Sequence, residues 1–89
     1  MEEKREALLT FPCVFPIKVM GRREDGFAQT VAEIVQRHAP DFHPHTLEMR
    51  TSRNGRYLSL TATVNARSQE QLDALYTELS RHPSVKIVL

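Results

Sequence analysis

The sequence predicts an α+β domain in which two helices cover one face of a four-stranded antiparallel sheet. Residues 57–65 alternate between polar and apolar side chains without interruption, as a strand that is buried on one side does. Apolar residues also recur with helical spacing over 27–35 and over 72–79. The predicted elements follow one another as strand, helix, strand, strand, helix, strand within a chain of 89 residues.

The central strand is predicted over residues 56–65. Its inward side chains are Leu58, Leu60, Ala62 and Val64. The preceding dipeptide Asn54-Gly55 predicts a hairpin with a type I′ turn, because both residues tolerate positive φ. The hairpin joins this strand to a second one over 46–53, with Leu47, Met49 and Thr51 facing inward.

The first and last strands are shorter and less regular. We place the first over 15–20, with Pro12 and Pro16 before it or at its first positions, because proline cannot donate to a ladder. Gly21 is expected to end it. The last strand is predicted over 85–89, with Val85, Ile87 and Leu89 on its inward face.

Two amphipathic helices separate these strands. The first is predicted over 26–39, with Asp25 as its N-cap and Pro40 after its end. The second is predicted over 68–82. Ser68 and Gln71 have the spacing of a capping box at its start.

This order is that of the ferredoxin-like sandwich, a split βαβ plan. Right-handed crossovers place both helices on one face and order the strands fourth, first, third, second. We therefore expect one domain over 11–89, preceded by an arm over 1–10. The sheet face away from the helices stays uncovered, and we call it the open face. Its expected side chains include Lys18, Arg50, Tyr57 and Thr61.

The bulk composition narrows the classes of function. A formal net charge of +1 gives no bulk attraction for nucleic acid. The single cysteine, Cys13, cannot form an internal disulfide, and no apolar run reaches membrane-spanning length. These features predict a cytoplasmic protein with no membrane association.

Several segments resemble the YbeD family of small bacterial proteins, whose function is unassigned. They are L-L-x-F-P-x-x-F-x-x-K-V-M-G over 8–21, V-Q-R-H-A-P over 35–40, N-G-R-Y-L-S-L-T over 54–61, L-Y-x-E-L over 75–79 and the terminal V-x-x-V-L. The resemblance implies a fold similar to ACT-type regulatory domains. It implies no catalytic residue and no cofactor. The family's genes often lie near lipoate-attachment genes, which points to a link with lipoate metabolism.

The connection over 21–26 is the first candidate site. It joins a strand end to a helix N-terminus, where unpaired N–H groups bind anions. The resemblance to ACT-type domains implies the same place, because such domains bind amino acids at this connection. The predicted ligand-binding residues are Gly21, Arg22, Arg23, Gly26 and Phe27. A plain connecting loop is the alternative.

A second cluster contains His38, His43 and His45 near Asp41. Such side chains can bind a transition metal, but no cysteine supports them and His38 suits a helix C-terminus. We therefore assign no metal site.

We expect a protein that is not an enzyme and serves as a regulatory or interaction module. Its partner is a protein or a small-molecule effector, and a homodimer is a further option. The alternative is an RNA-binding domain, because a similar fold stacks bases on aromatic residues of the open face. That face offers Tyr57 as its aromatic residue, so nucleic acid is the less favoured partner.

Overall fold

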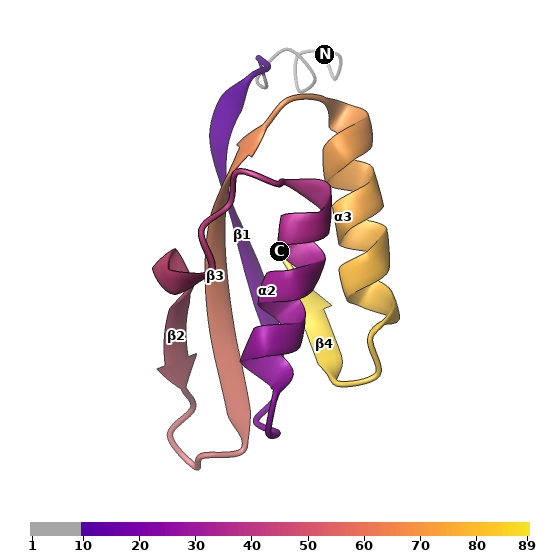
Figure 1. Cartoon of the computed structure of the whole chain (residues 1–89). Coiled ribbons are helices and arrows are strands. Elements are labelled where there is room, and N and C mark those ends of the chain that lie inside the picture. The colour runs from indigo at the N-terminus through magenta and orange to yellow at the C-terminus, as the bar shows by residue number, and fades with distance from the viewer. Residues whose placement is uncertain (1–9) are drawn as a thin grey trace, which may run out of the picture.

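The computed structural model describes residues 10–89, which form two layers (Figure 1). Its elements are β1 (Cys13–Arg22), α2 (Phe27–His38), a 3-10 turn (Pro44–Thr46), β2 (Glu48–Thr51), β3 (Tyr57–Ala66), α3 (Gln69–Arg81) and β4 (Val85–Val88). The four strands pair antiparallel in the order β2-β3-β1-β4, and both helices lie on one face of the sheet. The predicted α+β sandwich and strand order are confirmed. The arm predicted over 1–10 falls, apart from Thr10, outside the described residues.

The core lies between the sheet and the helices. In the central strand pair, Val19 is opposite Leu60 and Ile17 is opposite Ala62, and all of these side chains are fully buried. The helices contribute buried residues at the predicted spacing, which are Phe27, Val31, Ala32, Ile34 and Val35 from α2 and Leu72, Leu75 and Leu79 from α3. The inward assignment of Leu60 and Val64 is therefore correct.

Strand β1 extends beyond the predicted 15–20 at both ends. Lys18 exchanges backbone hydrogen bonds with Leu89, at 3.1 Å and 2.8 Å, so the backbone N of Pro16, two residues earlier, points to the same outer side of the strand. Within residues 10–89, β4 and Leu89 pair only with the part of β1 from Lys18 onward. The missing N–H of Pro16 therefore breaks no bond to β3, and the proline is tolerated inside the strand.

The hairpin keeps the predicted register but has a different turn. Thr51 is opposite Leu58, as the Asn54-Gly55 signal requires. However, Gly55 has φ 78° and Asn54 does not have a positive φ, so the type I′ prediction is wrong. The Asn54 Oδ1 accepts hydrogen bonds from the Arg56 N at 3.0 Å and the Ser52 Oγ at 2.9 Å. These bonds stabilise a longer connection, closed by the Ser52 N–Tyr57 O hydrogen bond at 2.9 Å.

One of the two predicted helix caps is present. The Ser68 Oγ accepts from the Gln71 N at 3.1 Å, and the Gln71 Oε1 accepts from the Arg67 N at 2.6 Å. The predicted Asp25 cap is wrong. Gly26 occupies the cap position of α2 with φ 81° and no side-chain cap bond, because the chain enters this helix through a left-handed residue.

The facing of β4 also differs from the prediction. Met20 pairs with Ile87, but the next residue, Gly21, pairs with Val85, so the register shifts at Lys86. This irregularity turns Val85 and Val88 toward the core. Ile87 and Leu89 instead lie on the open face, 47% and 65% exposed. The prediction of Val85, Ile87 and Leu89 on one inward face is therefore wrong for the last two.

Candidate functional site

The five residues predicted around the 21–26 connection do not share one environment. Gly21 is part of β1, and Phe27 is 3% exposed. A Cβ on Gly21 would overlap the Ser84 carbonyl oxygen and the Phe27 ring, so this glycine permits close packing of β1, β4 and α2. Within this set, Gly26 and the two arginines, Arg22 and Arg23, are exposed.

The helix N-terminus is also less open than the sequence suggests. The Phe27 N donates to the Glu24 carbonyl oxygen at 3.1 Å. The ring of Phe27 packs edge-on against His82, with 6.1 Å between the centroids. Phe27 therefore has a structural role, and neither its N–H nor its side chain is available to a ligand.

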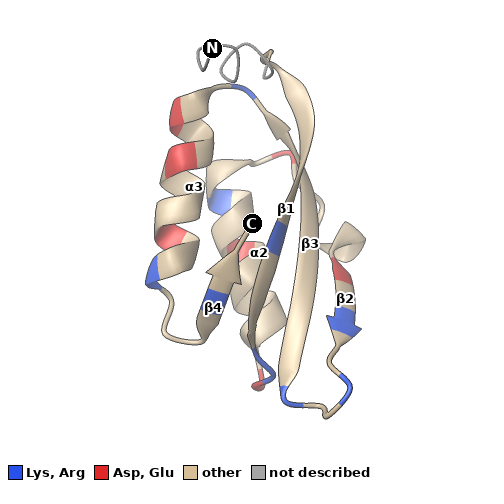
Figure 2. Cartoon of the chain, turned by 180° about the vertical axis from the view of Figure 1, so that it is seen from behind, with Lys and Arg blue, Asp and Glu red and all other residues tan. Residues whose placement is uncertain are grey.

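Strand pairing brings arginines of the β2–β3 hairpin beside those of the β1–α2 connection. Arg22 lies opposite Tyr57 in the ladder. The Arg23 N donates to the Arg56 carbonyl oxygen at 2.9 Å, and the Arg23 Nη1 donates to the Gly55 carbonyl oxygen at 3.2 Å. We call this part of the molecule, formed by Arg22, Arg23, Arg53 and Arg56, the arginine end. Figure 2 shows the basic residues gathered at the ends of β1 and β3 and in the hairpin.

The arginine end surrounds a shallow hollow of ≈ 380 Å³. Its lining consists of Arg22, Arg23, Glu24, Arg56 and Tyr57. The Glu24 carboxylate accepts a hydrogen bond from the Ser84 Oγ at 2.5 Å. Three of the five lining residues are therefore basic, and the one carboxylate among them already accepts a hydrogen bond from Ser84.

The residues predicted on the open face all lie there. Lys18 is opposite Thr61, Arg50 is opposite Ser59, and Tyr57 alternates with the inward Leu58. These residues line two hollows. Lys18, Arg50 and Tyr57 line one of ≈ 300 Å³, and Lys18, Arg50 and Thr61 line another of ≈ 250 Å³.

An apolar patch occupies the β1–β4 side of the open face. It consists of Met20, Ile87 and Leu89, because the register shift in β4 turns the last two outward. Lys18 is the ladder neighbour of Leu89, and the exposed Lys86 lies at the shift. The sequence prediction missed this patch, since it assigned Ile87 and Leu89 to the core.

The histidines predicted as a cluster have separate partners. The His38 Nε2 donates to the Glu78 Oε1 at 2.7 Å, whereas the rings of His43 and His45 lie next to each other at an interplanar angle of 40°, with 5.6 Å between centroids. Across residues 10–89, no three His, Cys, Asp or Glu side chains lie close enough together to hold a metal ion.

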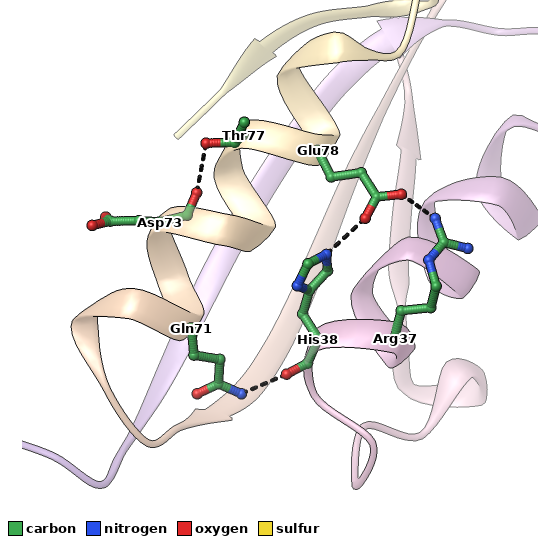
Figure 3. A network of polar contacts seen from close by, with 6 residues as sticks. All are labelled: Arg37, His38, Gln71, Asp73, Thr77 and Glu78. Atoms are coloured by element: carbon green, nitrogen blue, oxygen red, sulfur yellow. Dashed lines mark hydrogen bonds and ion pairs between the residues drawn. The ribbon is translucent and has the colours of Figure 1, made fainter.

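His38 belongs instead to a network that joins the two helices (Figure 3). Arg37 donates to the Glu78 Oε2, and the Gln71 Nε2 donates to the His38 carbonyl oxygen at 2.8 Å. The hydrogen bond from His38, and then that from Arg37, lowers the pKa of the Glu78 carboxyl below its ordinary value. This network is partly buried, with only Arg37 exposed, and it holds the end of α2 against α3.

The strand order and the two helices define an ACT-like α+β sandwich. The fold is similar to that of the ACT domain from the GTP pyrophosphokinase of Chlorobium tepidum, with a TM-score of 0.63 and 12% identity over 86% of this chain and 97% of that one. It is also similar to the solution structure of protein HP0495 from Helicobacter pylori, with a TM-score of 0.73 and 18% identity over 91% of this chain and 85% of that one.

The chain belongs to the family described as protein of unknown function (DUF493), whose model matches residues 6–89. A UPF0250 protein of Nitrosomonas europaea is 55% identical over 94% of this chain and 97% of its own length. A UPF0250 protein of Chromobacterium violaceum is 46% identical over 100% of both chains. The YbeD-like resemblance is thereby confirmed. Neither helix within residues 10–89 combines the length and the apolar character needed to cross a bilayer.

Proposed function

We propose that this protein is a non-enzymatic interaction module that binds a protein partner through the β1–β4 side of its open face. The observation that carries the proposal is the apolar patch of Met20, Ile87 and Leu89. Ile87 and Leu89 are 47% and 65% exposed on a sheet face that neither helix covers. Apolar groups gathered at one place on a small domain are typical of an interaction surface.

The charges around the patch favour a partner of a particular kind. Lys18 adjoins Leu89, Lys86 lies at the register shift, and Arg22 follows Met20 by two residues on the same side of β1. Each of these side chains is basic and exposed. A partner with an apolar centre and carboxylates at its rim would complement them. A second copy that contacted this patch with its own patch would bring like charges together, so we favour a different protein over a homodimer.

The fold supports a regulatory role by analogy. The Chlorobium tepidum neighbour is an ACT domain of a GTP pyrophosphokinase. A shared fold hosts many functions, so the likeness supports only the general class of module. The link to lipoate metabolism, which the family resemblance implies, provides a first set of partners to test.

The proposal is tested by photo-crosslinking in a bacterium that carries the gene. A photoreactive phenylalanine analogue replaces Ile87 in one strain and the exposed Thr77 on α3 in a matched control strain. We expect Ile87, and not Thr77, to crosslink one protein. That protein, once purified, should bind the wild-type chain and should lose this binding with Ile87→Asp.

Two outcomes would contradict the proposal. One is a crosslinking pattern that is the same from Ile87 and Thr77. The other is catalysis: turnover of a metabolite by the purified protein, abolished by a single substitution that leaves the fold intact, would show that the protein is an enzyme.

A further inference from the structure

The arginine end holds four guanidinium groups from two segments that are distant in the sequence. Arg22 ends β1 and Arg23 follows it, while Arg53 and Arg56 lie in the connection between β2 and β3. All four side chains are exposed. The hydrogen bond between the Arg23 N and the Arg56 carbonyl oxygen, 2.9 Å long, makes these two arginines cross-strand neighbours.

This arrangement has an electrostatic cost. Like charges that lie opposite one another across a strand pair are destabilising. The ion pairs formed between residues 10–89 are Arg37–Glu78, His38–Glu78 and Arg67–Asp41, and none of them includes a member of the arginine end. Glu24, the carboxylate in the hollow, is held by Ser84. A bound anion would offset the mutual repulsion.

The geometry suits an anion with several charged oxygens. The hollow has a volume of ≈ 380 Å³, at the low end of the roughly 300–1,000 Å³ typical of ligand sites. The bond from the Arg23 Nη1 to the Gly55 carbonyl oxygen, 3.2 Å long, fixes that guanidinium and leaves its other N–H groups available. Guanidinium groups donate two parallel hydrogen bonds to phosphate oxygens.

We propose that the arginine end binds the di- or triphosphate group of a small ligand. A single carboxylate would neutralise only one of the three guanidinium groups that line the hollow, whereas a polyphosphate carries several negative charges. Single-stranded RNA is bound instead along a basic groove with stacking aromatic residues at successive bases. Here the cluster is confined to one end of the sheet, and Tyr57 is the one aromatic side chain in its hollow. The proposal does not rest on the protein partner proposed above, although Arg22 belongs to both surfaces.

The experiment is calorimetric titration of the full chain with inorganic tripolyphosphate at low salt, with orthophosphate as the less charged comparison. Arg56→Gln is the test variant, and Arg81→Gln is its charge-matched control at the exposed end of α3. We expect tripolyphosphate to bind more tightly than orthophosphate. Arg56→Gln should weaken it at least about tenfold, and Arg81→Gln should leave it unchanged.

Arg22→Lys provides a second test that keeps the net charge and removes the forked donor. Weaker tripolyphosphate binding by this variant supports recognition by the guanidinium group. Folding of each variant is checked by far-ultraviolet circular dichroism. Three outcomes would overturn the proposal: no heat of binding, equal losses for Arg56→Gln and Arg81→Gln, or mixed-sequence single-stranded RNA that binds more tightly than tripolyphosphate.

Discussion

Glu78 holds His38 at the junction of the two helices: the His38 Nε2 donates to the Glu78 Oε1 at 2.7 Å (Figure 3). The bond connects the last turn of α2 to the third turn of α3. Because the Glu78 carboxyl also accepts from Arg37, one carboxylate contacts two donors of the neighbouring helix.

The first prediction concerns the acid stability of this junction. The hydrogen bonds from His38 and Arg37 lower the pKa of Glu78 below its ordinary value of 4.5. The folded state therefore binds the proton less readily than the unfolded state. The stabilisation is complete above pH 4.5 and is lost as the pH falls through the lowered pKa. Glu78→Gln should reduce the urea midpoint at neutral pH and flatten its decline in acid.

Glu48→Gln on β2 is the control for that measurement, because Glu48 forms no hydrogen bond or ion pair with the side chains of residues 10–89. Asp41 also has a lowered pKa, chiefly through the hydrogen bond from Asn65, so acid still destabilises Glu78→Gln to some degree. If Glu78→Gln and Glu48→Gln showed the same pH profile, the junction would contribute nothing to acid stability.

The second prediction tests the close packing at Gly21. A methyl group there meets the backbone oxygen of Ser84 and the ring of the buried Phe27. Gly21→Ala should therefore destabilise the protein by about 1–3 kcal/mol, as overpacked cores do. Ala replacement at Gly55, where the φ is 78° but the neighbours are farther away, separates steric overlap from backbone strain. An unchanged midpoint for Gly21→Ala would contradict the packing.

The third prediction tests the register shift in β4. Ile87 faces the open side, while Val88 packs against the core. Ile87→Asp should change the free energy of unfolding by less than about 0.5 kcal/mol, which is typical of surface substitutions. Val88→Asp should cost several times more, because it places a charge against the core at a partly buried position. Equal effects in urea unfolding would show that the strand lacks the shift.

The fourth prediction concerns RNA. We expect no gel shift with mixed cellular RNA at micromolar protein and physiological salt, since the net charge is +1. The structure places Tyr57 opposite Arg22, so Tyr57→Ala alone does not distinguish stacking from loss of the polyphosphate hollow. Salt dependence separates them better: a shift that fades steeply with salt and requires Tyr57 would favour the RNA-binding alternative.

The sequence predicted the fold because its strongest patterns lie on the central elements. The alternation over 57–65 places Leu60 in the core, and the stripe from Phe27 to Val35 places α2 over it. The errors fall in short segments, where few residues determine the register and the facing of the side chains. In β4, one extra residue at Lys86 reverses the facing of Ile87, and such an irregularity depends on the partner strand as well as on the local sequence.

Only part of the candidate site could be predicted from the sequence. Arg22 and Arg23 stood out because they end a strand and precede a helix. Arg56 gives no such local signal, since its proximity to Arg23 depends on the register between β1 and β3. That register follows from the alternation in both central strands, so the signal was present but required the pairing to be worked out.

Gln71 forms hydrogen bonds with the ends of both helices. Its Oε1 closes the start of α3 by accepting from the Arg67 N at 2.6 Å, and its Nε2 reaches the last carbonyl oxygen of α2, that of His38, at 2.8 Å. Fraying of either terminus withdraws a partner from the other. We therefore expect the end of α2 and the beginning of α3 to open together, with amide protons that exchange with solvent at linked rates.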